Sequence, residues 1–203
     1  MTQVSSGIRS ILAIPIIYDI FQNMMGARRI RREFVDEFVR PAKGARLLDI
    51  GCGTARLLDY LPPDIVYVGY DPSFDYIASA RRNFGGRGEF IHGIYDEIAA
   101  SNQQPFDLAV AHGVLHHLDD EQVTDLCELV RGSLKPQGRF VTLDTAFCRG
   151  RSPLARFLAA RDRGLTVRLG EEYSALVAPY FTKVKSKLKC RLWYTHWIME
   201  CAK

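Results

Sequence analysis

A strand that turns on two glycines into a helix is the feature that most constrains this chain. The stretch LLDIGCGTARLLDYL, residues 47–61, is an apolar run, then an acid, then a turn containing Gly51 and Gly53, and then a helical pattern. Glycine allows a tight turn and a close approach of the backbone to a ligand at the carboxyl end of a strand. We therefore expect a β-α-β unit that holds a nucleotide-like ligand at this turn.

Strand and helix signals alternate through most of the chain. Strands are predicted at 45–50, 65–71, 88–93, 106–113 and 138–144, with helices at 54–61, 73–84 and 119–134 between them. Helices are also predicted within 8–39 and 150–180, and an antiparallel strand pair at 183–193 and 195–202. The pattern predicts an α/β fold, a three-layer doubly wound sheet that is mostly parallel with an antiparallel C-terminal pair.

Length, charge and cysteines narrow the class of protein. The 203 residues suffice for one domain, and the net charge of +4 is divided into +4 for 1–46, −8 for 47–148 and +8 for 149–203. This uneven distribution of charge is expected either for solvated helix and strand surfaces or for a protein that steers an anionic partner electrostatically. The chain has no separate basic domain, so a nucleic-acid partner is not favoured. Five cysteines without a C-x-x-C pair indicate reduced thiols and a cytoplasmic location. The apolar run at 11–18 is shorter than the roughly 20 residues that a membrane span needs.

The glycine turn departs from the dinucleotide-binding pattern. The third position of G-x-G-x-x-G is Arg56, and Asp49 lies two residues before the first glycine. A carboxylate at this position repels a pyrophosphate and suits a ligand that carries an amine or another cation. With its D-x-G-x-G pattern the chain resembles a class I S-adenosylmethionine-dependent methyltransferase.

Three later segments extend the resemblance over residues 46–145. Asp71 closes the second strand 22 residues after Asp49, the third strand ends FIHGIYDEI, and the fourth ends AHGVLHHLDD. The resemblance implies a seven-stranded sheet, S-adenosylmethionine as cofactor, and ribose contacts from Asp71. This family often has Asp directly after the glycine of the third strand, where this chain has Ile94. The cofactor-binding residues expected on this basis are Tyr18, Asp49, Gly51, Cys52, Gly53, Asp71, Pro72, Ile94, Tyr95, Asp96, Ala111 and His112.

Candidate catalytic residues lie at the ends of the fourth and fifth strands. Three of the five histidines fall within HGVLHH, and Asp144 closes the next strand. A histidine beside a carboxylate can act as an oriented general base toward a hydroxyl group. The arrangement resembles that of sugar O-methyltransferases. We expect His116 or His117 to be the base with Asp144 as partner, unless one histidine caps the following helix and the other packs in the core.

The resemblance places the acceptor between the N-terminal helices at 8–40 and the insert at 146–180, with 181–203 as the C-terminal strand pair. Arg168, Tyr194 and His196 are the substrate-binding candidates, and Arg168 suits a carboxylate or phosphate on the acceptor. Asp144 is the only acid placed for a catechol-type metal site, so we expect no metal. Lys183, Lys185, Lys187 and Lys189 alternate as at a protected sheet edge or along an acidic ligand.

These residues predict a single-domain methyltransferase for a small molecule, acting at oxygen, with in-line displacement. The chain lacks the [N/D]-P-P-[Y/F/W] motif of enzymes that methylate base amino groups and the Pro-Cys nucleophile of pyrimidine carbon-5 methylators. Methylation of RNA or protein, and a non-catalytic cofactor-binding protein of the same fold, remain the alternatives. The acceptor, the choice of oxygen over nitrogen or carbon, and the oligomeric state are left open.

Overall fold

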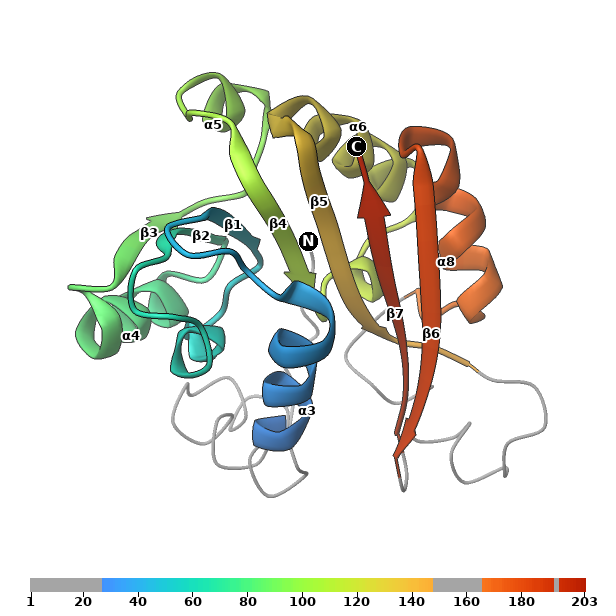
Figure 1. The fold of residues 1–203 in the computed structure, drawn as a ribbon, viewed down its shortest axis with the longest axis horizontal. Coiled ribbons are helices and arrows are strands. Elements are labelled where there is room, and N and C mark those ends of the chain that lie inside the picture. Colours follow the sequence, from blue (N-terminus) through green and yellow to red (C-terminus); the bar gives the residue numbers. More distant parts are fainter. Residues whose placement is uncertain (1–26, 148–165, 192–193) are drawn as a thin grey trace. The chain divides into compact units, whose positions relative to one another are not determined.

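The computed structural model describes residues 27–147, 166–191 and 194–203 (Figure 1). Three parts of the expected site lie outside the described residues: residues 8–26 of the N-terminal helical segment at 8–40, which include Tyr18, residues 148–165 of the insert at 146–180, and the side chain of Tyr194. The chain divides into two compact units, Thr2–Tyr95 and Asp96–Lys203. Each is described by itself, and the expected single domain over residues 1–203 stays a prediction.

The described part of the first unit contains three parallel strands. Its described elements are α3 (Ala27–Phe34), η1 (Val35–Val39), β1 (Arg46–Ile50), η2 (Arg56–Asp59), β2 (Val66–Asp71), α4 (Phe74–Phe84) and β3 (Gly88–His92). β2 pairs in parallel with β1 and with β3. Apolar residues on both faces of the strands, among them Leu47, Leu48 and Val68, are buried, as is usual for strands covered on two sides. α4 is capped by Ser73, and it ends before Gly85 as the predicted helix at 73–84 does.

Four strands lie in the part of the second unit that the structure describes. Its described elements are α5 (Glu97–Ser101), β4 (Phe106–His112), η3 (Leu115–His117), α6 (Asp120–Ser133), β5 (Leu134–Thr145), α8 (Gly170–Val177), η4 (Ala178–Tyr180), β6 (Lys183–Arg191) and β7 (Tyr194–Ala202). β4 and β5 are parallel, whereas β7 is antiparallel to both β5 and β6. Within this unit α6 and α8 contact each other, and they contact β5 and β6 respectively.

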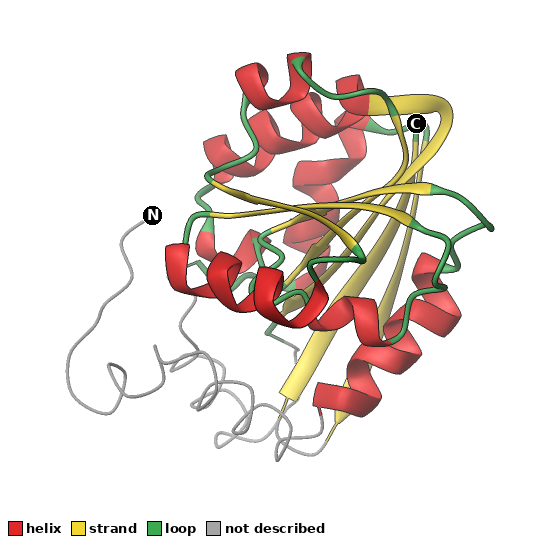
Figure 2. Cartoon of the chain, turned by 90° about the vertical axis from the view of Figure 1, so that its left-hand side faces the viewer, coloured by secondary structure: helices red, strands yellow, loops and turns green. Residues whose placement is uncertain are grey.

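The strand order is β3-β2-β1-β4-β5-β7-β6, a seven-stranded mixed sheet. Figure 2 shows the strands in yellow and the intervening helices in red. This order confirms the predicted α/β class, with parallel strands followed by an antiparallel C-terminal pair. β6 is last in the order, so the lysine row lies on an edge strand, and Lys183, Lys185 and Lys187 are exposed.

The structure corrects the predicted helix at 54–61. Only the single 3₁₀ turn η2 forms there, because Ala55 adopts a left-handed conformation with φ of 58° and Pro62 follows closely. Its leucines, Leu57 and Leu58, are nevertheless buried. The short elements α5 and η3 were not predicted.

None of the helices in the described ranges has the length and apolar character needed to cross a bilayer.

Candidate active site

The glycine turn after β1 is fixed by hydrogen bonds to the end of β2. The backbone N–H groups of Gly51 and Cys52 donate to the carbonyl oxygen of Tyr70 at 2.8 and 3.0 Å. Gly51 and Gly53 have φ of 67° and 56°, in the left-handed region that favours glycine. A Cβ atom at Gly53 would meet no atom within 4 Å. The backbone of the turn therefore borders open space that a ligand can fill.

Asp71 closes the same turn from β2. Its Oδ2 accepts a hydrogen bond from the N–H of Gly53 at 2.9 Å, and its Oδ1 accepts one from the N–H of Ser73 at 2.8 Å. Burial raises the pKa of Asp71, while these two hydrogen bonds act in the opposite direction. Each carboxylate oxygen can accept more than one hydrogen bond. The carboxylate is therefore held in one orientation and keeps acceptor capacity suited to ribose hydroxyls.

Asp49 is buried beneath the turn and is bonded to a residue that the sequence analysis missed. The hydroxyl of Tyr67 donates to Asp49 Oδ2 at 2.6 Å. Burial raises the pKa of Asp49 to about 7; the Tyr67 hydrogen bond lowers it and the charge of Asp71 raises it further. This carboxyl group consequently titrates near neutral pH, where a ligand cation can select its ionised form.

The position of Tyr67 follows from the strand register. Asp49 pairs with Gly69, so Tyr67, two residues earlier on β2, is its diagonal neighbour on the same face. A Cβ at Gly69 would lie 2.9 Å from both Cys52 Sγ and Tyr67 Cε1. Gly69 thus leaves the space into which these two side chains pack. The pairing register was the missing signal.

The expected adenine side of the cofactor site lies at the end of β3. The side chain of Ile94 is 58% exposed, whereas Tyr95 is buried with its ring edge-on to Tyr70 at 5.1 Å. Asp96 belongs to the second unit, where its Oδ1 accepts a hydrogen bond from the N–H of Ala99 and caps α5. Pro72 is exposed. The adenine contacts of these residues stay predictions.

Two of the expected cofactor-binding residues, Ala111 and His112, lie in the second unit at the end of β4. Ala111 is buried and His112, the last residue of β4, is half-buried. Gly113 follows with φ of 76°, and its N–H donates to the carbonyl oxygen of Leu143 on β5 at 2.7 Å. A Cβ at Gly113 would lie 3.6 Å from His116 Cε1. This turn therefore brings the chain back so that His116 lies beside it.

His116 and Asp144 form a buried pair, as the sequence predicted for one of the two histidines. Asp144 Oδ1 lies 3.0 Å from His116 Nδ1 and also accepts a hydrogen bond from the backbone N–H of His116 at 3.3 Å. An imidazole that donates from Nδ1 carries its lone pair on Nε2. Asp144 thus selects the tautomer in which Nε2 can accept a proton.

His117 is the neighbour of this pair. Its ring centroid lies 4.2 Å from that of His116, with the ring planes inclined by 38°. His117 is half-buried and closes η3. The geometry thus assigns the carboxylate contact to His116.

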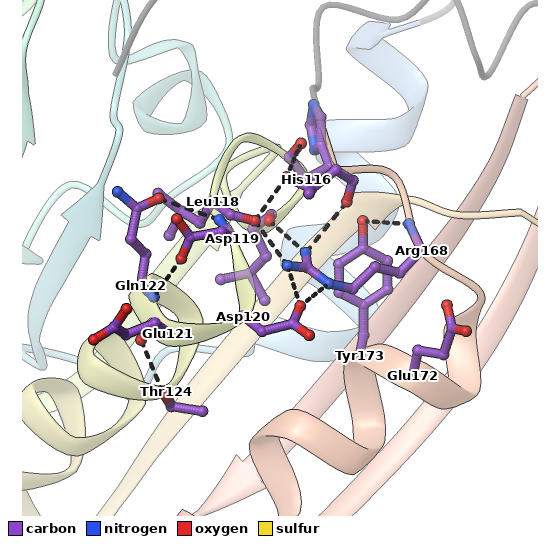
Figure 3. Close-up of polar contacts among 12 residues, drawn as sticks. His116, Leu118, Asp119, Asp120, Glu121, Gln122, Thr124, Arg168, Glu172 and Tyr173 are labelled. Carbon is purple, nitrogen blue, oxygen red and sulfur yellow. Dashed lines mark hydrogen bonds and ion pairs between the residues drawn. The ribbon is translucent and has the colours of Figure 1, made fainter.

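The environment of Arg168 corrects its expected role as an anion binder (Figure 3). Nε and Nη2 donate to Asp120 Oδ1 at 2.9 and 2.7 Å. Nη1 donates to the carbonyl oxygens of Leu115 and Thr166 at 3.1 and 3.2 Å, and Nη2 donates to that of Leu118 at 2.8 Å. A guanidinium has five N–H groups, and these bonds use all of them. The side chain is accordingly a structural bridge rather than a receptor for an acceptor anion.

The other expected substrate-side residues are separate from this cluster. In β7, His196 pairs with Thr145 of β5 and Trp197 pairs with Asp144. Side chains alternate between the faces of a strand, so His196 lies on the face opposite Asp144. Tyr194 was expected on the face of His196, and its side chain is not among those described. Their substrate contacts stay predictions.

The described residues contain no group of three or more His, Cys, Asp or Glu side chains that could hold a metal ion. The expected absence of a metal stays a prediction.

The comparisons with known proteins agree with this geometry. The family described as "Methyltransferase domain" matches residues 48–140, which include the glycine turn, Asp71 and the histidine segment. An uncharacterized methyltransferase of Staphylococcus carnosus is 33% identical over 119 residues, 57% of this chain and 54% of that protein. The chain therefore spans about half the length of this curated relative.

Solved structures share the fold at low sequence identity. The pyocyanin biosynthetic protein PhzM has a TM-score of 0.73 at 19% identity, covering 98% of this chain and 63% of its own. The mitomycin 7-O-methyltransferase MmcR has a TM-score of 0.67 at 18% identity, covering 93% and 58%. Residues 48–140, which include the D-x-G-x-G turn, therefore match a methyltransferase domain, and the chain shares the fold of these solved structures.

Proposed function

We propose that this protein transfers the methyl group of S-adenosylmethionine to a hydroxyl oxygen of a small-molecule acceptor, with His116 as general base. The observation that carries the proposal is the buried contact of 3.0 Å between His116 Nδ1 and Asp144 Oδ1. The similarity to the fold of MmcR, a 7-O-methyltransferase, supports oxygen as the acceptor atom.

Two acidic side chains and the open turn at Gly53 support binding of the cofactor by the first unit. Bound S-adenosylmethionine supplies an electrophilic methyl group on a sulfonium centre. Asp49, with its pKa of about 7, suits the methionine ammonium group, and Asp71 suits the ribose hydroxyls. The open space at Gly53 leaves room beside the turn, where a side chain would otherwise stand. We assign cofactor binding to these residues.

The second unit supplies the proton acceptor. His116 Nε2 takes the proton of the acceptor hydroxyl as the new oxygen–carbon bond forms, while the sulfur–carbon bond breaks. Asp144 keeps the imidazole in the productive tautomer and stabilises the imidazolium that results. Asp144 Oδ2 is buried and makes no hydrogen bond among the described residues, so its charge is directed mainly at His116. With the guanidinium of Arg168 saturated, we do not extend the proposal to an anionic acceptor.

Methyl transfer from labelled S-adenosylmethionine to a panel of small hydroxylated compounds tests the proposal. We expect His116→Gln to lower kcat by roughly 10²–10⁴-fold, the usual contribution of a general base, with the cofactor Kd unchanged. Asp144→Asn should lower kcat similarly because it reverses the tautomer preference. A loss in His117→Gln with activity retained in His116→Gln would assign the base to His117 instead.

The same assay separates the alternatives. Label in RNA or protein, with none in the small molecules, would overturn the small-molecule acceptor. Cofactor binding by folded protein without transfer to any acceptor class would leave a non-catalytic binding protein.

A further inference from the structure

We propose that Arg168 is a positioning residue that fixes the backbone turn carrying His116, and so sets the orientation of the general base. This inference rests on the proposed function of His116. Arg168 lies within the expected substrate-side insert at 146–180, and its guanidinium binds the turn between β4 and α6. This part of the insert is thereby tied to the turn that carries His116.

The guanidinium holds both ends of that turn. Nη1 bonds the carbonyl oxygen of Leu115, directly before His116, and Nη2 bonds that of Leu118, directly after His117. The N–H of Leu118 donates to Leu115 O at 3.2 Å and closes the 3₁₀ turn Leu115–His117, and Leu118 is the residue that follows this turn. Arg168 adds further donors to the carbonyl oxygens of Leu115 and Leu118 from one rigid, planar group.

A second residue of the same segment binds the carbonyl of His116 itself. The backbone N–H of Thr166 donates to His116 O at 3.1 Å, and Thr166 Oγ1 donates to Leu118 O at 2.7 Å. The carbonyls of Leu115, His116 and Leu118 are thus all held by residues 166–168. With the ring fixed by Asp144, both the backbone and the side chain of His116 are constrained.

The bridge is itself held in place from two sides (Figure 3). Arg168 is only 8% exposed, so its charge requires a partner, and Asp120 at the start of α6 provides one. The guanidinium carbon lies 5.4 Å from the centroid of the buried Tyr173 ring. The hydroxyl of Tyr173 accepts a hydrogen bond from the N–H of Arg168 and donates one to the carbonyl of Thr145, adjacent to Asp144. Burial raises the pKa of Tyr173, so this hydroxyl keeps its proton at neutral pH.

Arg168→Lys is the informative substitution because it keeps the charge and removes the fork of donors. An ammonium group has three donors and cannot span Asp120 and the turn carbonyls together. A misplacement of a catalytic group by about 1 Å can cost roughly 10²-fold in rate. We therefore expect kcat to fall by about 10–100-fold with the cofactor KM and Kd changed less than about twofold. Thr166→Val removes only the hydroxyl, which lies 2.7 Å from Leu118 O and 3.5 Å from His116 O, and should have a smaller effect in the same direction.

The control is Arg139→Lys. Arg139 lies on β5 in the same unit and pairs with Glu200 at 3.2 Å, away from the turn. It should leave kcat and the thermal transition of the protein near their original values. Circular dichroism and cofactor titration on every variant establish that the folded fraction is unchanged.

A spectroscopic readout tests the inference without relying on activity. In protein labelled with ¹⁵N-histidine, the His116 ring nitrogens should report the Nδ1–H tautomer, and Arg168→Lys should broaden or mix this signal. A tautomer signal and kcat that remain as in the original protein, in a folded Arg168→Lys variant, would overturn the positioning role. If no acceptor is ever methylated, the proposed function fails, while the nitrogen spectrum still decides whether Arg168 orders His116.

Discussion

At the scale of single residues, Asp49 combines two properties that a cation-binding carboxylate needs. It is buried, which makes its charge effective, and it receives a hydrogen bond from Tyr67, which fixes its direction. Burial raises its pKa from 3.8 to about 7. The folded protein therefore binds this proton more tightly than the unfolded chain, and the affinity for a cationic ligand becomes linked to pH.

We predict that affinity for S-adenosylmethionine rises as pH approaches 7, because ligand binding requires ionised Asp49. Titration calorimetry between about pH 5 and about pH 7.5 avoids the range in which α-amino groups lose their own proton. The slope should reach at most about tenfold per pH unit below the pKa of Asp49. In the free protein the same group contributes stability below about pH 4 that is lost as pH rises to about 7.

Variants separate Asp49 from other titrating groups. Asp49→Asn should weaken binding and flatten the profile, and Tyr67→Phe should move its midpoint upward because the lost hydrogen bond lowers the pKa of Asp49. Asp75→Asn on the exposed surface of α4 is the matched control. A flat profile in the original protein would show that Asp49 does not contact the cation.

Strand-end logic predicted some residues of the site and missed others. His116 and Asp144 were expected to lie together because neighbouring parallel strands end at the same edge, and their side chains do meet; their catalytic roles stay predictions. Arg168 was expected to face the acceptor, yet the two residues that enclose it, Asp120 and Tyr173, lie on different helices. Neither periodicity nor motif spacing indicates such contacts between distant segments. Only the folded chain shows that the hydrogen-bond donors of Arg168 are all used.

At the scale of elements, the packing of α8 on β7 depends on the absence of a side chain at Gly170. A Cβ there would lie 2.2 Å from Cε3 of Trp197, and the indole N–H of Trp197 donates to Ser174 Oγ at 3.0 Å on the same helix. The helix therefore begins with its backbone against the indole ring.

We predict that Gly170→Ala destabilises the protein by about 1–3 kcal/mol, the usual cost of overpacking, although alanine is the better helix former. Gly132→Ala in α6 is the matched control. Gly132 is exposed, and its Cβ would meet nothing within 4 Å, so we expect a gain of about 0.5–1 kcal/mol. Urea unfolding of both variants measures the difference. A stabilised Gly170→Ala would show that Trp197 moves away without cost.

The same reasoning explains which elements the sequence could predict. The helices predicted at 73–84 and 119–134 form as α4 and α6, and the structure shows Ser73 and Asp119 as their N-caps. The predicted helix at 54–61 was wrong in length because its periodicity, LLDYL, cannot reveal the left-handed Ala55. One 3₁₀ turn is enough to bury Leu57 and Leu58. Periodicity identifies the buried face, and local backbone geometry decides the type of helix.

At the scale of the whole molecule, the proposed cofactor-binding acids and the tryptophans lie in different units, which allows a test of whether the two units act as one domain. Asp49 and Asp71 belong to the first unit, whereas both tryptophans of the chain, Trp193 and Trp197, belong to the second. Tryptophan fluorescence therefore reports unfolding of the second unit, and a ligand that prefers the first unit stabilises the second only if the two are coupled.

We predict one cooperative transition that S-adenosylhomocysteine shifts as a whole. Ligand at about 100 times its Kd adds about 2.7 kcal/mol, which corresponds to a shift of roughly 5–10 °C for a domain of this size. Fluorescence and far-ultraviolet circular dichroism should give the same midpoint with and without ligand. Asp71→Asn should reduce the shift measured by both probes if Asp71 makes the proposed ribose contact. If the two units are coupled, the second unit cannot unfold without release of the cofactor. Two separate transitions, with a fluorescence midpoint that the ligand does not change, would therefore show that the units unfold independently.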